Sequence, residues 1–466
     1  MDPVTHGLVG AAAGLSILTA WQRKGLTASQ RKGWLEAGAN RDAYKTRWAA
    51  ALCGLIGGEL PDADRVIDAL FQLFGPEGQG LSYMLNHRGP SHTVVACLAA
   101  APLLALLTRA LARRVSPPFW LLVGIAGMGL LLHLAMDGMN DYGVHPFPPL
   151  SQRWFYGDFL FLAEPTLWAA LLPYILLMLG LPSKRLIGVC AVLGVAVFSG
   201  LVWLNQWLTS FGAVVALLCL VGQALLQRRG PRSAIAWASV MLVLVVFFTA
   251  SRVARRGAMQ WMAKQAAGEH VVDVVTTPAP ANPFCWRVIT VTRDGDSFVA
   301  RMGMLSFAGV DAMTCYAPPH GIIPGSACGL ARCREKSANV LPFAEFSGSF
   351  SQFEQLARTN PRVGATRHFL RVPFWGRDAR SNACESVKNP ALGEPNICSI
   401  AAGSLLRKAR SQPERLLIGD LRVDYNENDV GEFCKYPFPD KLEEPYDVDW
   451  PVGAPPFFHE RPRAAR

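Results

Sequence analysis

The sequence predicts a mainly α-helical, polytopic membrane protein of six to eight apolar helices, followed by a C-terminal β-rich or α+β domain outside the membrane. The 466-residue chain is 51% hydrophobic and only 17% charged, an apolar and charge-poor composition for a soluble protein. The apolar residues gather in long runs with almost no charge, each near the roughly 20 residues that cross about 30 Å of hydrocarbon. The rest of the chain is rich in Pro, Gly, Cys and polar residues.

Six runs are long enough to predict membrane-spanning helices. They are Thr93–Leu111, Pro118–Met136, Phe159–Leu181, Leu186–Trp203, Leu208–Leu226 and Ala234–Ala250. Two shorter runs, His6–Ala20 and Trp48–Leu60, are expected to be tilted, partly buried or re-entrant. The chain opens with Asp2 and His6 instead of a basic region, so we expect no cleavable signal peptide and a retained first run.

Basic residues between the runs predict the orientation. Residues 21–47 carry seven Lys and Arg against Glu36 and Asp42, and the alternate connections 59–92, 137–158 and 204–207 hold only Arg65, Arg88 and Arg153. Because positively charged loops stay in the cytoplasm, both termini are expected on the outer, periplasmic side of a bacterial inner membrane. The net charge of +10 therefore indicates orientation in a lipid bilayer and not a nucleic-acid partner, which would need a basic face on a folded domain.

The tail predicts a separate outer domain. We expect a membrane domain at 1–251, a β-rich domain at 252–450 and a Pro-rich, disordered end at 451–466. A helix near Arg252–Ala267 would join the first two, and the strand candidates are Trp286–Thr292, Ser297–Met302, His368–Phe374, Leu416–Val423 and Tyr446–Trp450. Seven of the eleven cysteines lie in this tail, and an oxidising compartment would pair some of them. Their connectivity stays open.

Histidines and acids gather at the predicted outer ends of the first four runs. Ionisable groups at such positions are costly and indicate function. His133 and Asp137 are four residues apart and share one face of a helix. The whole set of candidate metal ligands is His6, Asp62, His87, His92, His133 and Asp137. Imidazole and carboxylate suit a divalent ion such as zinc, so the sequence predicts one metal site of unknown ion count.

Three residues have candidate catalytic roles. Asp62 and Asp64 can orient or deprotonate water, and Arg88 can neutralise negative charge at a helix N-terminus. Structural alternatives stay open. Ser91 can cap a helix, the acids can be solvated at a helix end, and His133 with Asp137 can be a polar contact between helices. His145, Asp141 and Asp158 are weaker candidates.

The ordered motifs resemble those of the YdjM-type family of inner-membrane, metal-dependent hydrolases. The resemblance rests on residues 1–10 (MDPVTHGLVG), 59–64 (ELPDAD), 87–92 (HRGPSH), 133–137 (HLAMD) and 143–158, with fragments at 278–286 and 420–422. The family is distantly similar to zinc-dependent phospholipase C and single-strand nucleases, and this implies His6, Asp62, His87, His133 and Asp137 as the first ligands to test. The N-terminal amine that serves as a ligand in those secreted enzymes has no evident counterpart. Glu164 stands where family members often carry aspartate before Pro165.

We therefore expect a membrane-embedded metal-dependent hydrolase that acts on a phosphoester or lipid-like substrate. The alternative is a non-catalytic envelope or stress-response protein in which the metal only holds helices together. Transport ranks third, because transporter sites lie near the bilayer midplane and these residues lie at one face. Substrate and oligomeric state are unknown from sequence.

Overall fold

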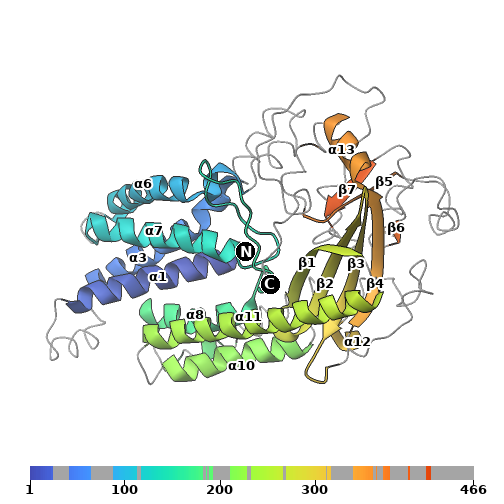
Figure 1. The fold of residues 1–466 in the computed structure, drawn as a ribbon. Coiled ribbons are helices and arrows are strands. Elements are labelled where there is room, and N and C mark those ends of the chain that lie inside the picture. The colour runs from blue at the N-terminus through green and yellow to red at the C-terminus, as the bar shows by residue number, and fades with distance from the viewer. Residues whose placement is uncertain are drawn as a thin grey trace.

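The computed structural model describes a helical half and a sheet half that meet at one end of the helices (Figure 1). It describes residues 1–24, 41–64, 88–112, 117–181, 185, 188–190, 192, 210–227, 232–265, 269–310, 312–315, 340–359, 364, 371–377, 397–398 and 416–420.

Four described helices are long and apolar enough to cross a membrane, at Pro3–Arg23, Val94–Ala112, Phe119–Asp137 and Arg232–Lys264. They belong to α1 (Pro3–Lys24), α6 (Val94–Ala112), α7 (Phe119–Asp137) and α11 (Arg232–Gln265). The expected six to eight spans are therefore not confirmed. The run at Phe159–Leu181 forms only the 14-residue helix α8 (Pro165–Met178), because its first residues belong to an irregular loop. Most of Leu186–Trp203 lies outside the described residues.

The first short run gives a longer helix than expected. Pro3 starts α1 at a position where its missing N–H is no loss, and the Asp2 carboxylate accepts a hydrogen bond from the Thr5 backbone N–H at 3.2 Å. The second short run lies inside α3 (Arg41–Glu59), which is followed by the 3₁₀ turn η1 (Leu60–Ala63). A second such turn, η3 (Pro90–His92), precedes α6.

Glycines bring α1 and α3 into direct backbone contact. A Cβ atom added to Gly10 would lie 2.1 Å from the Gly54 carbonyl oxygen, and a Cβ on Gly54 would lie 2.1 Å from the Gly10 oxygen. A Cβ atom added to Gly58 would likewise lie 2.4 Å from the His6 carbonyl oxygen. Small residues of this kind let helices pack closely within a membrane. This close crossing sets His6 beside the end of α3.

The sheet half is antiparallel. Its five-stranded sheet has the order β1 (His270–Ala279), β2 (Asn282–Asp294), β3 (Ser297–Ser306), β4 (Val340–Ser349) and β6 (Ile397–Cys398). A separate pair joins β5 (Pro373–Arg377) to β7 (Leu416–Asp420). Two short helices, α12 (Ala312–Cys315) and α13 (Phe350–Thr359), accompany the strands.

The predicted strands at Trp286–Thr292 and Ser297–Met302 are confirmed within β2 and β3. Their turn contains Gly295 at φ +55°, a conformation that glycine adopts without strain. The described part of Leu416–Val423 forms β7, and the last two residues of His368–Phe374 belong to β5, while residues 368–370 lie outside the described residues. Tyr446–Trp450 and the tail 451–466 lie outside the described residues. The sequence analysis missed β1 and β4.

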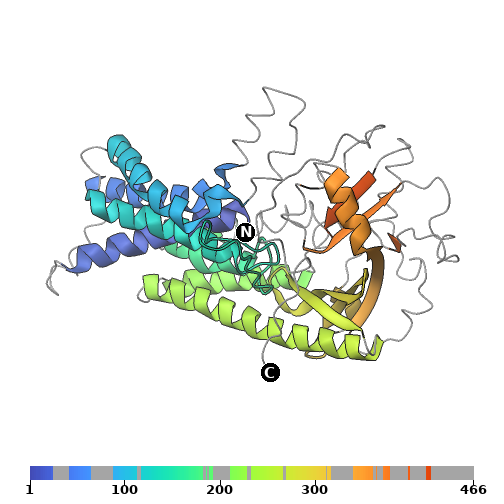
Figure 2. The same ribbon diagram turned by 45° about the horizontal axis from the view of Figure 1, so that its top comes forward.

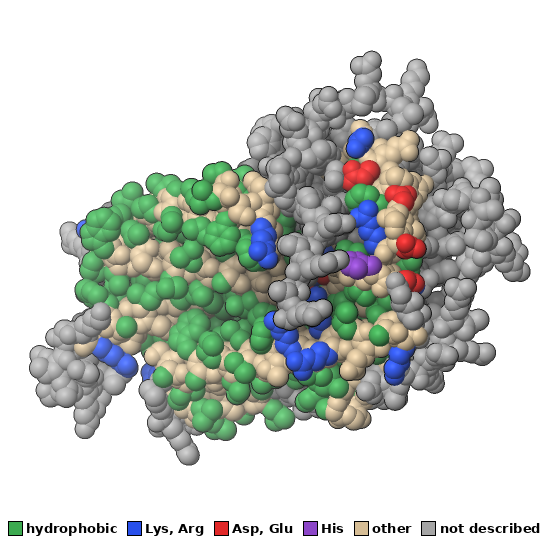
Figure 3. All heavy atoms as spheres, in the orientation of Figure 1, with side chains coloured by type: hydrophobic (Ala, Val, Ile, Leu, Met, Phe, Trp, Pro, Cys, Tyr) green, Lys and Arg blue, Asp and Glu red, His purple; other side chains and the backbone are tan. Residues whose placement is uncertain are grey.

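One long helix connects the two halves. α11 runs without a break through the expected domain boundary at residue 251, so the predicted joining helix is the end of this helix. Its last part packs on the sheet, with Trp261 and Met262 in one buried cluster with Val288 and Leu305. Figure 2 shows α11 extending from the other helices to lie along the strands. The face in Figure 3 is mainly hydrophobic over the helices, and among the described residues the acidic side chains visible on it lie over the sheet half.

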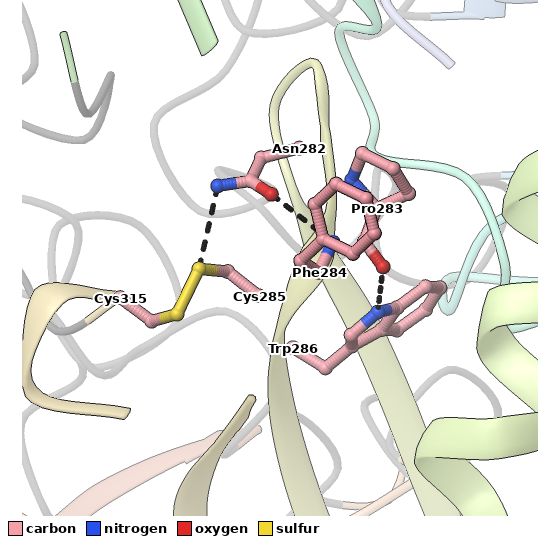
Figure 4. The surroundings of a disulfide bond; sticks show 6 residues. All are labelled: Asn282, Pro283, Phe284, Cys285, Trp286 and Cys315. Carbon is pink, nitrogen blue, oxygen red and sulfur yellow. Dashed lines mark hydrogen bonds between the residues drawn. A yellow bond between two sulfur atoms is a disulfide. The ribbon is translucent and has the colours of Figure 1, made fainter. Parts of the chain in front are cut away.

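A disulfide bond joins Cys285 on β2 to Cys315 on α12 (Figure 4). The Asn282 side-chain amide donates to the Cys285 sulfur at 3.3 Å, and the Trp286 indole donates to the Pro283 carbonyl at 2.7 Å. The expectation that some cysteines of the tail pair is met by this bond. Cys53, Cys97, Cys190 and Cys219, all in the helical half, are free thiols.

Candidate metal centre

Five of the predicted ligands converge at the end of the bundle that faces the sheet. His6 lies on the first turns of α1, Asp62 on η1, His92 on η3, and His133 with Asp137 on the last turns of α7. His6, His92, His133 and Asp137 have no exposed surface, and the Asp62 side chain is 12% exposed. Segments far apart in the sequence thus bring imidazole and carboxylate groups together, as the loop charges predicted.

The Nε2 atoms of His92 and His133 point at the same carboxylates. The two nitrogens are 3.2 Å apart, and they lie 3.5 and 3.4 Å from Asp137 Oδ2. Asp62 Oδ1 lies 3.3 Å from His92 Nε2 and 3.8 Å from His133 Nε2. Two sets of three residues offer ligand atoms that lie within 4.8 Å of one another: His6 with His133 and Asp137, and Asp62 with His92 and His133. His133 belongs to both sets.

A backbone contact orients His133. Its Nδ1 lies 2.6 Å from the Gly58 carbonyl oxygen. A carbonyl oxygen can only accept, so Nδ1 carries the proton and Nε2 presents its lone pair to the carboxylates. This arrangement is how proteins fix the tautomer of a metal-ligating histidine. The glycine contact between α1 and α3 brings that carbonyl into place.

His6 is the most informative member of the cluster. Its ring stacks on His133 with 3.7 Å between ring centroids, and its Nε2 lies 3.5 Å from Asp137 Oδ1. Both ring nitrogens are buried, and neither has a hydrogen-bond partner among the described residues. Asp137 Oδ2 is buried without such a partner as well. Because unsatisfied buried polar atoms cost free energy, this donor set fits a metal ion that would take the lone pair of the unprotonated His6 nitrogen and one from Asp137 Oδ2.

Burial and contacts within the cluster set the charge states of Asp62 and His92. Burial raises the pKa of Asp62, but the hydrogen bond from His92 and the nearby His133 outweigh burial, so the pKa lies below its ordinary range. Burial lowers the pKa of His92 more than the neighbouring carboxylates raise it. Asp62 is therefore ionised and His92 neutral near pH 7, the states that metal binding requires.

Arg88 and Asp64 lie at the rim of this cluster. The Arg88 guanidinium donates to Asp137 Oδ1 at 2.9 Å and to the Gly143 carbonyl, while its backbone N–H donates to Asp64 at 3.3 Å. Arg88 is 3% exposed and has φ +54°, an uncommon conformation for a bulky residue. It therefore holds the Asp137 carboxylate. The expected role of Arg88 in charge neutralisation stays a prediction, as do the catalytic roles of Asp62 and Asp64.

The amino group of Met1 also contacts Asp137 and is fully buried. His87 lies outside the described residues. His145 is separate from the cluster and stacks on Trp154, with 4.4 Å between ring centroids.

A second buried cluster ties the loop after α7 to the sheet half. Arg371 donates to Asp158 at 2.6 and 2.9 Å and to Asp273 at 2.8 and 3.2 Å. Its guanidinium carbon lies 4.2 Å from the centre of the Tyr156 ring. Asp158 was a weaker ligand candidate and instead belongs to this cluster. Arg371 and Asp273 were not found from sequence, because no local pattern joins residues so distant in the chain.

Glu164 caps α8 and does not join the metal ligands. Its carboxylate accepts hydrogen bonds from the Thr166 N–H at 3.1 Å, the Thr166 hydroxyl at 2.6 Å and the Ala281 N–H at 3.2 Å. Ala281 lies in the turn between β1 and β2, so this acid also links the helices to the sheet. Burial raises the pKa of Glu164 to about 7. In the structure, the Glu164 carboxylate therefore acts as a hydrogen-bond acceptor.

No curated protein and no solved structure matches the chain. A family model described as YdjM inner membrane protein matches residues 1–208. That range contains every candidate ligand and catalytic residue and three of the four helices long enough to cross a membrane. Residues 1–208 of this chain are therefore similar to the YdjM family of inner membrane proteins.

Proposed function

We propose that the protein is a metal-dependent hydrolase of the inner membrane that acts on a phosphoester or lipid-like substrate. The observation that carries this proposal is the buried cluster of three imidazoles and two carboxylates in which both nitrogens of His6 lack a hydrogen-bond partner among the described residues. A protein keeps such a costly group when a ligand satisfies it. The resemblance to zinc-dependent phospholipase C supports the same chemistry.

The ligand set fits zinc best. His6, His92, His133, Asp62 and Asp137 would hold the ion or ions, and nitrogen and oxygen donors of this mixture suit zinc. When bound, such an ion acidifies a water molecule and polarises a phosphoryl oxygen. The two ligand sets share His133. Metal analysis would distinguish one bound ion per chain from two.

Asp62 and Asp64, the acids at the rim, would accept the proton of the attacking water. Asp62 and Asp64 are 12% and 11% exposed, so solvent reaches the cluster on their side. A carboxylate there can orient the attacking water and accept its proton. Arg88 would act first by fixing Asp137, to which it donates a hydrogen bond, and its charge would favour an anionic substrate nearby.

The second candidate is a non-catalytic envelope or stress-response protein with a structural metal. A structural zinc site is closed, whereas a catalytic site keeps an open position. The burial of His6, His92, His133 and Asp137 is compatible with a closed site. The partial exposure of Asp62 and Asp64 favours the enzyme, because it leaves an approach for water and substrate.

The sheet half would lie in the periplasm. It contacts the same end of the bundle as the metal cluster, for example where the Thr276 hydroxyl donates to the Asp158 carbonyl at 2.7 Å. The basic loops are expected at the opposite, cytoplasmic end. The disulfide between Cys285 and Cys315 supports an oxidising compartment.

Metal analysis of the purified protein, paired with phosphodiesterase and lipase assays, tests this function. The His133→Ala variant removes the ligand that both sets share, and the matched control His145→Ala removes a histidine outside the cluster. We expect stoichiometric metal in the wild type and the control, with metal and activity both lost in His133→Ala. Equal metal in all three proteins would refute the ligand assignment. If His133→Ala loses the metal but the wild type itself shows no hydrolytic activity, the structural role is favoured.

A further inference from the structure

The loop between α7 and α8 forms a hairpin with an exposed apolar tip. Val144 and Phe155 pair as an isolated antiparallel bridge, with backbone hydrogen bonds of 3.0 and 2.8 Å in the two directions. Between them, Leu150 is 91% exposed and Phe147 46%, and Phe155 itself is 38% exposed. Single exposed apolar residues are ordinary, but a contiguous group on a fixed turn indicates a binding surface.

The base of the hairpin is fixed and lies next to the metal cluster. Arg88 donates one hydrogen bond to the Gly143 carbonyl and another to Asp137. On the other side, Trp154 stacks between His145 and Tyr156, with centroid distances of 4.4 and 5.9 Å. Tyr156 in turn lies under Arg371. The residues at the base therefore hold the apolar tip in place. One side chain, that of Arg88, contacts both this base and Asp137, a candidate metal ligand.

Continuity with the apolar surface of α6 identifies the partner. The Val94 N–H donates to the Pro146 carbonyl at 2.9 Å, so the hairpin is joined to the start of α6. That helix exposes Val95 by 58% and Leu98 by 59% on its first turns, as expected of a helix that faces lipid. The tip thus begins where the membrane-facing surface of α6 ends, at the depth of the lipid headgroups.

Charge and aromatic residues at the tip match that depth. The Arg153 guanidinium lies 5.4 Å from the centre of the exposed Phe155 ring. A cation beside apolar side chains fits a boundary where phosphate groups meet acyl chains. Trp154 and Tyr156 are of the residue types that concentrate at membrane interfaces.

We propose that the tip, residues 147–155, inserts into the headgroup region of the outer leaflet beside the metal cluster. The lipid surface is its partner, and the hairpin would present membrane-resident phosphoesters to the site. The second clause rests on the proposed hydrolase function, whereas insertion itself does not.

Site-specific photocrosslinking in native membranes tests insertion directly. Benzoylphenylalanine would replace Leu150, a position so exposed that the replacement leaves the fold intact. Leu103, 67% exposed in the middle of α6, is the positive control, and the exposed Asp294 at the β2–β3 turn is the negative control. We expect phospholipid adducts by mass spectrometry at positions 150 and 103 and none at 294. Adducts to protein at position 150, or none there while position 103 labels lipid, would overturn the proposal.

Activity in two assay formats tests the link to the substrate. Leu150→Asp should lower turnover of a phospholipid in vesicles, while metal content and turnover of a soluble phosphodiester stay unchanged. Ser297→Asp adds the same charge at an exposed residue of the β2–β3 turn, outside the tip, and serves as the control for net charge. Equal loss on both substrates would overturn the presenting role. Lipid adducts at position 150 in a protein without hydrolytic activity would retain insertion and reject the hydrolase.

Discussion

The two buried polar clusters at the sheet end of the bundle differ in how their atoms are satisfied. In the cluster of Arg371, Asp158 and Asp273, each carboxylate oxygen accepts at least one hydrogen bond from the guanidinium. In the metal cluster, both His6 nitrogens and Asp137 Oδ2 lack hydrogen-bond partners among the described residues. Complete pairing stabilises an interface, whereas incomplete pairing at equal burial indicates a place reserved for a ligand.

Removing Arg371 should have the largest effect on stability. Arg371→Met leaves two buried carboxylates without their cation, and breaking such a pair costs about 3–5 kcal/mol. We expect a lower melting temperature and faster proteolysis of the sheet half. The triple variant Arg371→Met, Asp158→Asn, Asp273→Asn should recover much of the loss because it removes the unpaired charges. A single variant as stable as the wild type would show that the cluster does not hold the halves together.

Glu164 extends the comparison to a buried carboxylate that is hydrogen-bonded but has no cation partner among the described residues. Its pKa is raised from an ordinary 4.5 to about 7, so the folded state binds a proton more tightly than the unfolded state. This contribution to stability is complete at low pH and is lost as the pH rises from 4.5 towards 7. The total is at most about 3.5 kcal/mol, since each pKa unit corresponds to about 1.4 kcal/mol.

The Glu164→Gln variant isolates that contribution. Melting temperatures of both proteins should be measured from about pH 4 to about pH 9 in one detergent. The wild type should lose stability relative to the variant up to about pH 8, roughly one pH unit past the raised pKa, and run parallel to it above that pH. Parallel curves at every pH would mean that Glu164 titrates normally.

His6 should behave in the opposite way to Arg371. Replacing an unsatisfied buried group by an apolar one can be neutral or stabilising, so metal-free His6→Phe should melt at or above the wild-type temperature. Added metal stabilises a binding protein by about 2.7 kcal/mol at one hundred times its dissociation constant, and this increment should vanish in the variant. Destabilisation of metal-free His6→Phe would place His6 among the structural residues.

The glycine contact should have a modest effect on stability and still disturb the site. Gly54→Ala puts a Cβ atom 2.1 Å from the Gly10 oxygen, and overpacking of this kind costs about 1–3 kcal/mol. Gly124→Ala on α7 is the control, because nothing lies within 4 Å of the Cβ it would add. Metal content should fall in the first variant only, since separation of α1 from α3 moves both His6 and Gly58.

Much of the site was predictable because its residues follow local sequence patterns. His133 and Asp137 share a helix face by spacing alone, and the loop charges placed His6, Asp62 and His92 at the same end. The helices at 94–112 and 119–137 and the β2–β3 hairpin followed from apolar runs and a glycine turn. The apolar run at 159–181 was predicted to form one membrane-spanning helix, but α8 begins only at Pro165. Hydrophobicity alone does not show that Phe159 belongs to a loop.

By itself, the sequence determined the membrane class of the chain, the ends at which the ligands lie and the chemistry that those ligands favour. Composition and helical spacing are local properties, so they can be determined from the sequence without knowledge of the fold. Only the tertiary structure decided that Gly58 orients His133, that Arg88 holds Asp137, and that Arg371 clamps Asp158 to Asp273. Those contacts join segments up to 213 residues apart, and their geometry exists only once the helices and the sheet have packed.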